Sequence, residues 1–306
     1  MKKIFASIVV LSSIYLYLTY TISPKWSKLF HFSDTMYLFK HQVIYTLIGF
    51  ITFLIFIEVK SSIWFNRVGA LLFILSSVLL ISMCFLPAYL VPIIDGKKLY
   101  ILFGRIHIYP MLFFMLGSIW FMSYIYSTKT LKEFRLYTVG LILVSGLFTL
   151  LFHDYKMFLF LELVLIFLLF YTTGFNKYII GSIAGISLLL GLFIVEAPHR
   201  ILRLKNWLSS FGSYDVSKTL LEFNTLSLFI VLVFLFLIFS IIKKESKTKE
   251  SQFFALSVVV VFTISLALNI LTLFGFLPVA PPSLYFFDYG LSITLVSYMM
   301  IGMLVL

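Results

Sequence analysis

Two arginines that follow a proline are the residues best suited to bind a phosphate. Arg200 and Arg203 stand three positions apart in EAPHRILRLKNWL, residues 196–208. On a helix this spacing puts both guanidinium groups on one face. Arginine binds phosphates and carboxylates through a planar, two-pronged set of donors, so the pair is suited to clamp a pyrophosphate or a carboxylate. The alternative is that both side chains extend to lipid headgroups.

Two acids stand where the surrounding residues are apolar. Asp154 sits in a short turn between two apolar runs, and Glu162 lies about two helical turns inside the second run. An acid at or inside a membrane boundary must be solvated, neutral or paired, and is a candidate functional residue. For Asp154 the candidate partners are His153 and Lys156, and the alternative is simple exposure to water in a turn. Glu162 should face the interior of a helix bundle.

The elements that must position these residues are membrane-spanning helices. The chain has 306 residues, of which 62% are hydrophobic and 11% charged, whereas soluble domains are about half apolar and a quarter charged. A helix needs about 20 mostly apolar residues to cross a bilayer. We therefore expect an all-α polytopic membrane protein, with residues 1–306 forming one transmembrane domain of about ten helices. The expected spans are 4–22, 41–59, 68–92, 107–126, 136–153, 156–174, 177–196, 223–242, 252–275 and 289–306.

The distribution of charge predicts the orientation of the bundle. The loops on the side of the N-terminus carry the larger net positive charge, which favours a cytoplasmic N-terminus. The outer face also carries many basic residues, and these predict an anionic ligand such as a phosphate-bearing lipid. The alternative is contact with lipid headgroups or anionic wall polymers. The formal net charge of +11 is usual for a membrane protein and does not indicate binding to nucleic acid.

Two segments interrupt the pattern of spans. Residues 95–112, DGKKLYILFGRIHIYPML, combine Lys97 and Lys98 with aromatic residues, as segments at a membrane interface do. Residues 273–295, LFGFLPVAPPSLYFFDYGLSITL, contain three prolines, so one smooth helix cannot run through them. Irregular backbone at membrane depth is tolerated only where protein buries it or where it lines a cavity. We expect an irregular or re-entrant loop there, and an ordinary proline-rich connection is the alternative.

The order of residues in these segments resembles the FtsW/RodA/SpoVE family, also called the SEDS proteins. LPVAPPSLYFFDYGLS is similar to the family signature LPxTGxxLPFxSYGGSS, and DGKKLYILFGRIHIYP is similar to NGAKRWIxxGxxxxQP. Residues 196–208 resemble EPYRxxRxxxFL, FHDYK stands where the family has QPDLG, and YLFKHQVIYTLIGF resembles FLLRQLxWxxxG. The residues on which the resemblance rests include Lys40, Gln42, Gly49, Gly96, Lys97, Gly104, Pro110, Asp154, Arg200, Arg203, Pro278, Tyr289, Gly290 and Ser292.

The resemblance implies a ten-helix fold in the bacterial plasma membrane and an activity on its outer face. Members of the family polymerise glycan strands from lipid II and work with a class B penicillin-binding protein in division, elongation or sporulation. The roles implied here are Asp215 as the catalytic base, Lys97, Lys98, Arg200 and Arg203 as ligands of the substrate phosphates, and Asp154, Asp288, Tyr289 and Ser292 as residues that line the substrate cavity. No cofactor and no metal site is evident, and a divalent cation would arrive with the substrate pyrophosphate.

Departures from the family pattern leave other functions open. The outer loop at about 197–222 lacks the glycine-rich run of the family, and Asp215 is only the nearest positional counterpart of its catalytic acid. Leu112 replaces the carboxylate of the family's QPSE sequence. One alternative is a non-catalytic relative that binds a lipid-linked precursor or a penicillin-binding protein and regulates wall synthesis. Another is a flippase for the precursor, although the sequence shows no convincing internal repeat of the kind common in transporters.

Overall fold

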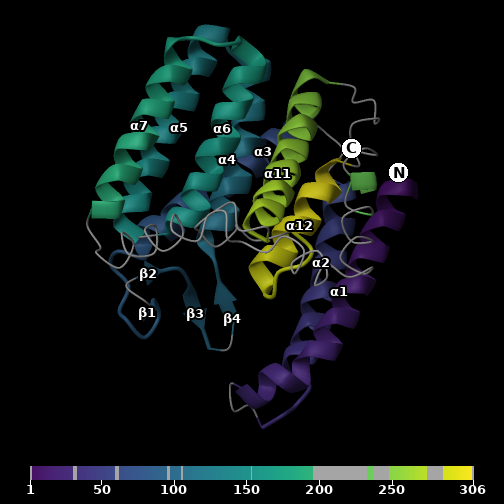
Figure 1. Ribbon diagram of the computed structural model, residues 1–306. Helices are drawn as coiled ribbons and strands as arrows, with labels where there is room; N and C mark the ends of the chain where they lie inside the picture. Colours follow the sequence, from purple (N-terminus) through teal and green to yellow (C-terminus); the bar gives the residue numbers. More distant parts are fainter. Residues whose placement is uncertain are drawn as a thin grey trace.

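The computed structural model is a helical bundle with a small group of strands at one end (Figure 1). It describes residues 2–29, 33–58, 62–94, 97–104, 106–152, 154–195, 233, 235–237, 248–273 and 285–304. Nine helices lie within these ranges. Their bounds are α1 Lys2–Leu29, α2 Tyr37–Glu58, α3 Ser62–Ser82, α4 Pro110–Thr128, α5 Leu131–Phe152, α6 Tyr155–Thr173, α7 Lys177–Val195, α11 Lys249–Leu273 and α12 Leu291–Leu304.

The helices confirm the expected polytopic architecture. In the described part of the chain, five helices are long and apolar enough to cross a membrane, and three shorter apolar helices accompany them. The expected span at 223–242 lies almost wholly outside the described residues. The expected span at 68–92 was too long, because α3 ends at Ser82 and a series of turns follows it. Pro87 and Pro92 explain the difference, since each removes a backbone donor from an apolar stretch that hydropathy alone continues.

The basic and aromatic segment after α3 forms two short antiparallel hairpins. Strand β1 (Ile93–Ile94) pairs with β2 (Lys97–Lys98), and β3 (Ile101–Phe103) pairs with β4 (Ile106–Ile108). Gly104, with φ of 61°, provides the left-handed residue that a tight hairpin turn requires. The N–H of Leu102 donates to the carbonyl of Leu90 at 2.7 Å, which ties the second hairpin to the turns after α3. The all-α class therefore holds with these two small sheets added.

Glycines allow two pairs of helices to approach closely. A Cβ atom at Gly117 on α4 would lie 2.7 Å from the backbone of Phe73 on α3. A Cβ atom at Gly49 on α2 would lie 2.4 Å from the ring of Tyr298 on α12. Contacts at these distances exclude a larger side chain without movement, because protein interiors are close-packed. The C-terminal helix is thus fixed against the second helix of the chain.

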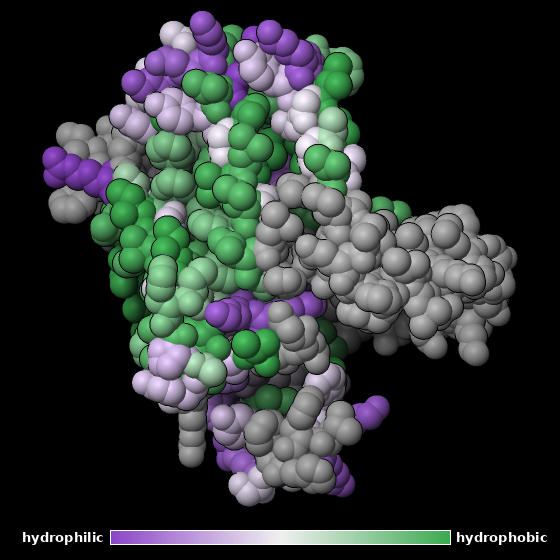
Figure 2. Space-filling model, turned by 90° about the vertical axis from the view of Figure 1, so that its left-hand side faces the viewer, coloured by the Kyte–Doolittle hydropathy of each residue, from purple (hydrophilic) through white to green (hydrophobic). Residues whose placement is uncertain are grey.

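The flank of the bundle carries an apolar belt between two hydrophilic ends (Figure 2). Exposed leucines of α5 repeat at helical spacing along the flank. They are Leu136, Leu143, Leu147 and Leu151. A soluble protein rarely exposes so much contiguous apolar surface. The belt is the part of the bundle that contacts lipid.

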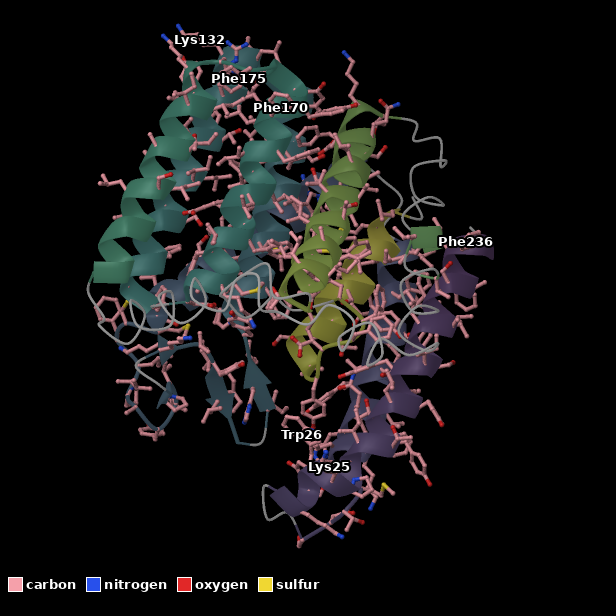
Figure 3. The ribbon with its side chains drawn as sticks, in the orientation of Figure 1. Lys25, Trp26, Lys132, Phe170, Phe175 and Phe236 are labelled. Carbon is pink, nitrogen blue, oxygen red and sulfur yellow. The ribbon has the colours of Figure 1, made fainter. Side chains whose placement is uncertain are left out.

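The chain crosses the bundle in alternating directions, which sorts its loops onto two ends. The strands lie at one end in Figure 1, and both termini lie toward the other. Figure 3 places Lys25 and Trp26 at the same end as the strands, and Lys132 at the opposite end. We call these the strand end and the terminal end. The turn between α5 and α6 and residues 285–290 also lie at the strand end, so the motif segments share one face of the molecule.

Candidate functional site

The site begins with a hydrogen bond between two segments that are distant in the sequence. The hydroxyl of Tyr109 donates to Oδ2 of Asp154. Tyr109 is the extended residue before Pro110, which starts α4, and Asp154 precedes the first turn of α6. The Asp154 side chain is only 5% exposed, so it is not an acid in a water-exposed turn. Its hydrogen-bond partner is Tyr109, Lys156 acts on it electrostatically as the sequence suggested, and the other expected partner, His153, lies outside the described residues.

A third segment joins the site at Ser292. This residue lies in the first turn of α12, and its hydroxyl accepts a hydrogen bond from the backbone N–H of Tyr109 at 2.9 Å. The same hydroxyl faces the carbonyl of His107 at 3.5 Å. Ser292 is 4% exposed. Tyr109 therefore joins the α5–α6 turn, through its side chain, to the start of α12, through its backbone.

Burial and charge control the protonation of this cluster. Burial raises the pKa of Asp154, while the Tyr109 hydroxyl, the backbone N–H of Met157 and the charges of Lys156 and Lys97 oppose the rise. Burial also raises the pKa of the Tyr109 hydroxyl, and the negative charge of Asp154 adds to this effect. A buried carboxyl whose pKa is raised can exchange a proton nearer neutral pH than a free one. Lys97 on β2 is close enough to act on Asp154 electrostatically.

Asp288 extends the same electrostatic neighbourhood. Burial raises the pKa of Tyr100, and the charges of Asp288 and Asp154 raise it further. The ring of Tyr100 lies 5.3 Å from that of Tyr109 between centroids. Oδ1 of Asp288 accepts the backbone N–H of Tyr289 at 3.0 Å. Both aspartates therefore act electrostatically on a pair of packed phenols.

Residues 285–290 are held in place by α2 and α12. Oε1 of Gln42 accepts the backbone N–H of Gly290 at 3.4 Å, and its Nε2 donates to the hydroxyl of Thr294 at 3.1 Å. Gly290 has φ of 133°, a conformation that residues with a side chain rarely adopt. Phe286, with φ of 69°, is a rarer case, and its N–H donates to the Ser297 hydroxyl at 3.3 Å. The backbone of residues 285–290 is thus irregular, and the three prolines of the predicted loop lie outside the described residues.

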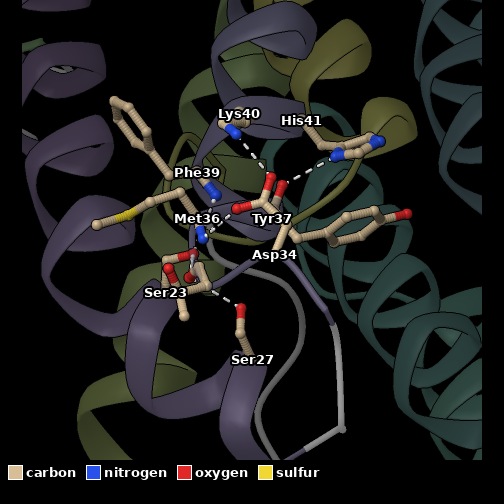
Figure 4. A network of polar contacts seen from close by, with 9 residues as sticks. Ser23, Ser27, Asp34, Met36, Tyr37, Phe39, Lys40 and His41 are labelled. Atoms are coloured by element: carbon tan, nitrogen blue, oxygen red, sulfur yellow. Dashed lines mark hydrogen bonds and ion pairs between the residues drawn. The ribbon is translucent and has the colours of Figure 1, made fainter.

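The corner between α1 and α2 is fixed by its own polar network (Figure 4). The hydroxyls of Ser23 and Ser27 both donate to the carbonyl of Thr35, each at 3.0 Å. Asp34 accepts the N–H of Met36 at 2.9 Å and pairs with Lys40 at 2.6 Å. These contacts set the start of α2 and therefore the position of Gln42 farther along that helix.

The predicted site residues fall into three groups. Asp154 and Ser292 belong to the hydrogen-bonded cluster, and Asp288 and Lys97 lie within its electrostatic reach. Lys98 and Tyr289 lie at the same end without a direct bond to the cluster. Lys98 pairs with Ile93 in the first hairpin, and Tyr289 is 41% exposed with its ring 6.1 Å from that of Tyr45. Asp215, Arg200 and Arg203 lie outside the described residues.

Sequence reasoning missed the residues that connect the cluster. Tyr109 stands where the family pattern has a glutamine, and that substitution was the only signal that pointed to it. Tyr100 occupies the position of a tryptophan in the same pattern. Gln42 was noted as a match, but its role appears only in the bonds to Gly290 and Thr294. In the described part of the chain, no group of three His, Cys, Asp or Glu side chains could hold a metal ion.

Glu162 lies inside the bundle, as its position in α6 predicts. Its side chain is 4% exposed. Within the described residues, its Oε1 atom has no hydrogen-bond partner. The expected burial of Glu162 is confirmed.

Comparison with known proteins identifies the family. The model of the FtsW/RodA/SpoVE family, described as "Cell cycle protein", matches residues 2–223, which is more than half of the chain. The chain belongs to this family. It is an integral membrane protein with several membrane-spanning helices, like the other members.

Individual relatives agree with the family match. Probable peptidoglycan glycosyltransferases FtsW from two strains of Helicobacter pylori, 26695 and J99, are each 28% identical over 205 residues. The match covers 63% of this chain and 53% of each relative, so the chain spans about half the length of the curated relatives it matches.

Solved structures support the fold. A chain from a peptidoglycan synthase complex that coordinates polymerization and crosslinking gives a TM-score of 0.71 at 13% identity, covering 97% of this chain and 95% of that one. The rod shape determining protein RodA of Thermus thermophilus gives 0.66 at 14% identity, covering 97% and 94%. At these identities the similarity shows the fold, which is that of the family.

Proposed function

We propose that this protein is a peptidoglycan glycosyltransferase that polymerises lipid II at the strand end of the bundle, on the outer face of the bacterial plasma membrane. The observation that carries the proposal is the meeting of three motif segments around Tyr109. Residues 95–112, the α5–α6 turn and the start of α12 converge there through bonds to Asp154 and Ser292. The names of the two curated relatives support the same activity.

Glycosyl transfer from a polyprenyl pyrophosphate makes two chemical demands. A base must take the proton of the acceptor hydroxyl, and cations must neutralise the leaving pyrophosphate. We assign the base to Asp215 and the phosphate contacts to Arg200, Arg203, Lys97 and Lys98. Any divalent cation would accompany the pyrophosphate as part of the substrate.

The cluster around Tyr109 and its neighbours at the strand end supply the wall of the substrate cavity in this proposal. Asp154, Asp288, Tyr289 and Ser292 would line it. The raised pKa of the buried Asp154 suits a residue that hydrogen-bonds a sugar hydroxyl without repelling the nearby phosphates. Lys97, which acts on Asp154 electrostatically, would contact the phosphates from the adjacent strand.

The partner that we propose is a class B penicillin-binding protein. One of the solved structures with this fold comes from a complex that couples polymerization to crosslinking. A polymerase of this family would pass its glycan product to such a partner.

A regulatory role is the second candidate, and a specific observation favours it. Leu112 stands where the family pattern has a glutamate, and the loop at about 197–222 lacks the glycine-rich run. A protein that kept the binding cluster but lost part of the catalytic loop would bind lipid II without polymerising it.

Polymerisation from purified lipid II distinguishes these candidates. The full chain would be reconstituted in liposomes with and without a candidate class B penicillin-binding protein, and glycan products and bound lipid II would be measured. Polymer supports the glycosyltransferase. Bound lipid II without polymer supports the regulator, and transfer of lipid II between leaflets without polymer supports a flippase. If lipid II is neither bound nor converted to product, and is not transferred between leaflets, all three candidates are contradicted.

A further inference from the structure

A cavity of about 240 Å³ lies on the flank of the bundle, far from the cluster around Tyr109. Arg67 and Ala70 of α3 line one side of it, and Trp120, Phe121 and Tyr124 of α4 line the other. Arg67 lies near the start of α3 and Tyr124 near the end of α4, so the cavity is close to the terminal end. Nothing in the proposed polymerase activity uses it.

The aromatic wall of the cavity is rigid. The ring of Trp120 packs beside Gly69, where a Cβ atom would lie only 2.6 Å from it. Phe254 supports the same ring from α11 at 5.8 Å between centroids. Phe121 stacks on Phe73 at 4.9 Å with an angle of 6° between the rings. The absence of a side chain at Gly69 therefore lets the Trp120 ring lie close against α3, and the small side chain of Ala70 borders the cavity beside the packed aromatic rings.

The cavity opens toward lipid. Arg67, Ala70 and Tyr124 are exposed on the surface of the bundle. An exposed apolar stripe of α3 continues from the cavity toward the strand end, and its residues are Leu71, Ile74, Leu75 and Val78. A cation and a tyrosine at headgroup depth, followed by an apolar stripe of this kind, match the two ends of a phospholipid.

We propose that this cavity binds an anionic glycerophospholipid of the leaflet at the terminal end. The guanidinium of Arg67 binds its phosphate, Tyr124 and Trp120 enclose the glycerol region, and the acyl chains follow the stripe on α3. An arginine binds a phosphate through two paired hydrogen-bond donors, so the site has a geometric specificity in addition to its electrostatic attraction for anionic lipid. The aromatic rings of α4 hold the lipid beside the closely packed α3–α4 pair.

Quenching of Trp120 fluorescence by brominated lipids tests the proposal. The full chain would be reconstituted in nanodiscs that contain increasing fractions of brominated phosphatidylglycerol or brominated phosphatidylcholine. Subtracting the signal of Trp120→Phe isolates the emission of Trp120 from that of the other three tryptophans. We expect half-maximal quenching at a fraction of phosphatidylglycerol that is about five-fold lower than that of phosphatidylcholine, because one basic residue near an anionic lipid strengthens binding by about this factor.

Variants separate a specific site from ordinary contact with surrounding lipid. Arg67→Gln should remove the preference for phosphatidylglycerol, whereas Lys132→Gln, which removes an exposed cation at the same end, should keep it. Ala70→Leu should fill the cavity and weaken quenching by both lipids while leaving the charge unchanged. Equal quenching by the two lipids in the unaltered protein, or a preference that survives in Arg67→Gln, would overturn the proposal.

Discussion

The phenol of Tyr109 donates a hydrogen bond to the carboxylate of Asp154, 45 positions later in the chain. The backbone N–H of the same tyrosine donates to Ser292 at 2.9 Å. Three of the segments that resemble family motifs are thereby joined through one residue. This arrangement explains how α4, α6 and α12 can hold a common site although the chain between them is long.

Replacing Tyr109 with phenylalanine tests whether this bond stabilises the bundle. The variant keeps the ring but leaves the buried carboxyl of Asp154 without its phenol donor. Loss of one partner of a buried polar pair costs about 1–3 kcal/mol. We therefore expect a lower melting temperature in detergent. Tyr89→Phe removes a phenol from a residue that is 76% exposed and is the matched control. Equal melting temperatures for the two variants would contradict a structural role for the bond.

The pH dependence of stability should reveal the raised pKa of Asp154. A carboxyl whose pKa is raised by folding stabilises the fold below its ordinary value near 3.8, and that contribution is lost as pH rises through the raised pKa. Asp154→Asn keeps an acceptor for Tyr109 but has no charge to bury. Its stability relative to the unaltered protein should therefore increase as pH rises from about 4 toward neutrality. Thermal melting across this range measures the difference.

Asp34 provides a control of opposite sign. Its bonds to Lys40 and to the N–H of Met36 lower its pKa, so its contribution is present above the ordinary value and is lost as pH falls through the lowered pKa. Asp34→Asn should be less stable than the unaltered protein near neutral pH, and the difference should shrink in acid. Two curves of the same sign for Asp34→Asn and Asp154→Asn would show that the assigned environments are wrong.

The contact between α2 and α12 should not tolerate a methyl group. In Gly49→Ala the added Cβ atom would lie 2.4 Å from the ring of Tyr298, so the helices must separate or the ring must move. Overpacking of this kind costs about 1–3 kcal/mol. Gly181→Ala is the control, because a Cβ atom at this position in α7 would meet no other atom within 4 Å, and alanine there should be neutral or stabilising. Equal melting temperatures for both variants would refute the close approach.

Gln42 should control the order of residues 285–290. Gln42→Leu removes the acceptor of the Gly290 N–H and the donor to Thr294, at similar side-chain volume. Hydrogen exchange at residues 285–290 should become faster, since an amide that loses its acceptor is less protected. Thr52→Val, which alters a partly exposed residue of the same helix, should leave this exchange unchanged. Unchanged exchange in Gln42→Leu would show that the loop is held by other contacts.

The sequence predicts the helices well because hydropathy is a local property. Long apolar runs placed most of the described spans within a few residues. The exceptions are α1, which continues to Leu29 although its predicted span ends at residue 22, and α3. The predicted span of α3 continued through Pro87 and Pro92 because the apolar residues around them keep the mean hydropathy high, whereas the helix ends at Ser82. The two hairpins after α3 were not predicted, since strands of two or three residues carry no clear periodic pattern.

The site was only partly predictable because its bonds are not local. Asp154 was recognisable as an acid at a membrane boundary, but its burial and its bond to Tyr109 depend on how α4 and α6 pack. Tyr109 carries no charge and stands beside an ordinary proline, so residue type alone does not single it out. Gln42 and Gly290 were both noted as motif residues, and only the fold shows that they contact each other.

Glycan polymerisation from purified lipid II by the unaltered protein and by Asp215→Asn, with the candidate penicillin-binding protein present, tests the central claim most directly. Asp34→Asn, a change of the same chemistry at a partly exposed residue between α1 and α2, is the control. The proposed function predicts polymer from the unaltered protein and from Asp34→Asn, and none from Asp215→Asn. Polymer from Asp215→Asn at the unaltered rate would contradict the assigned base, and its absence from all three proteins would contradict the polymerase itself.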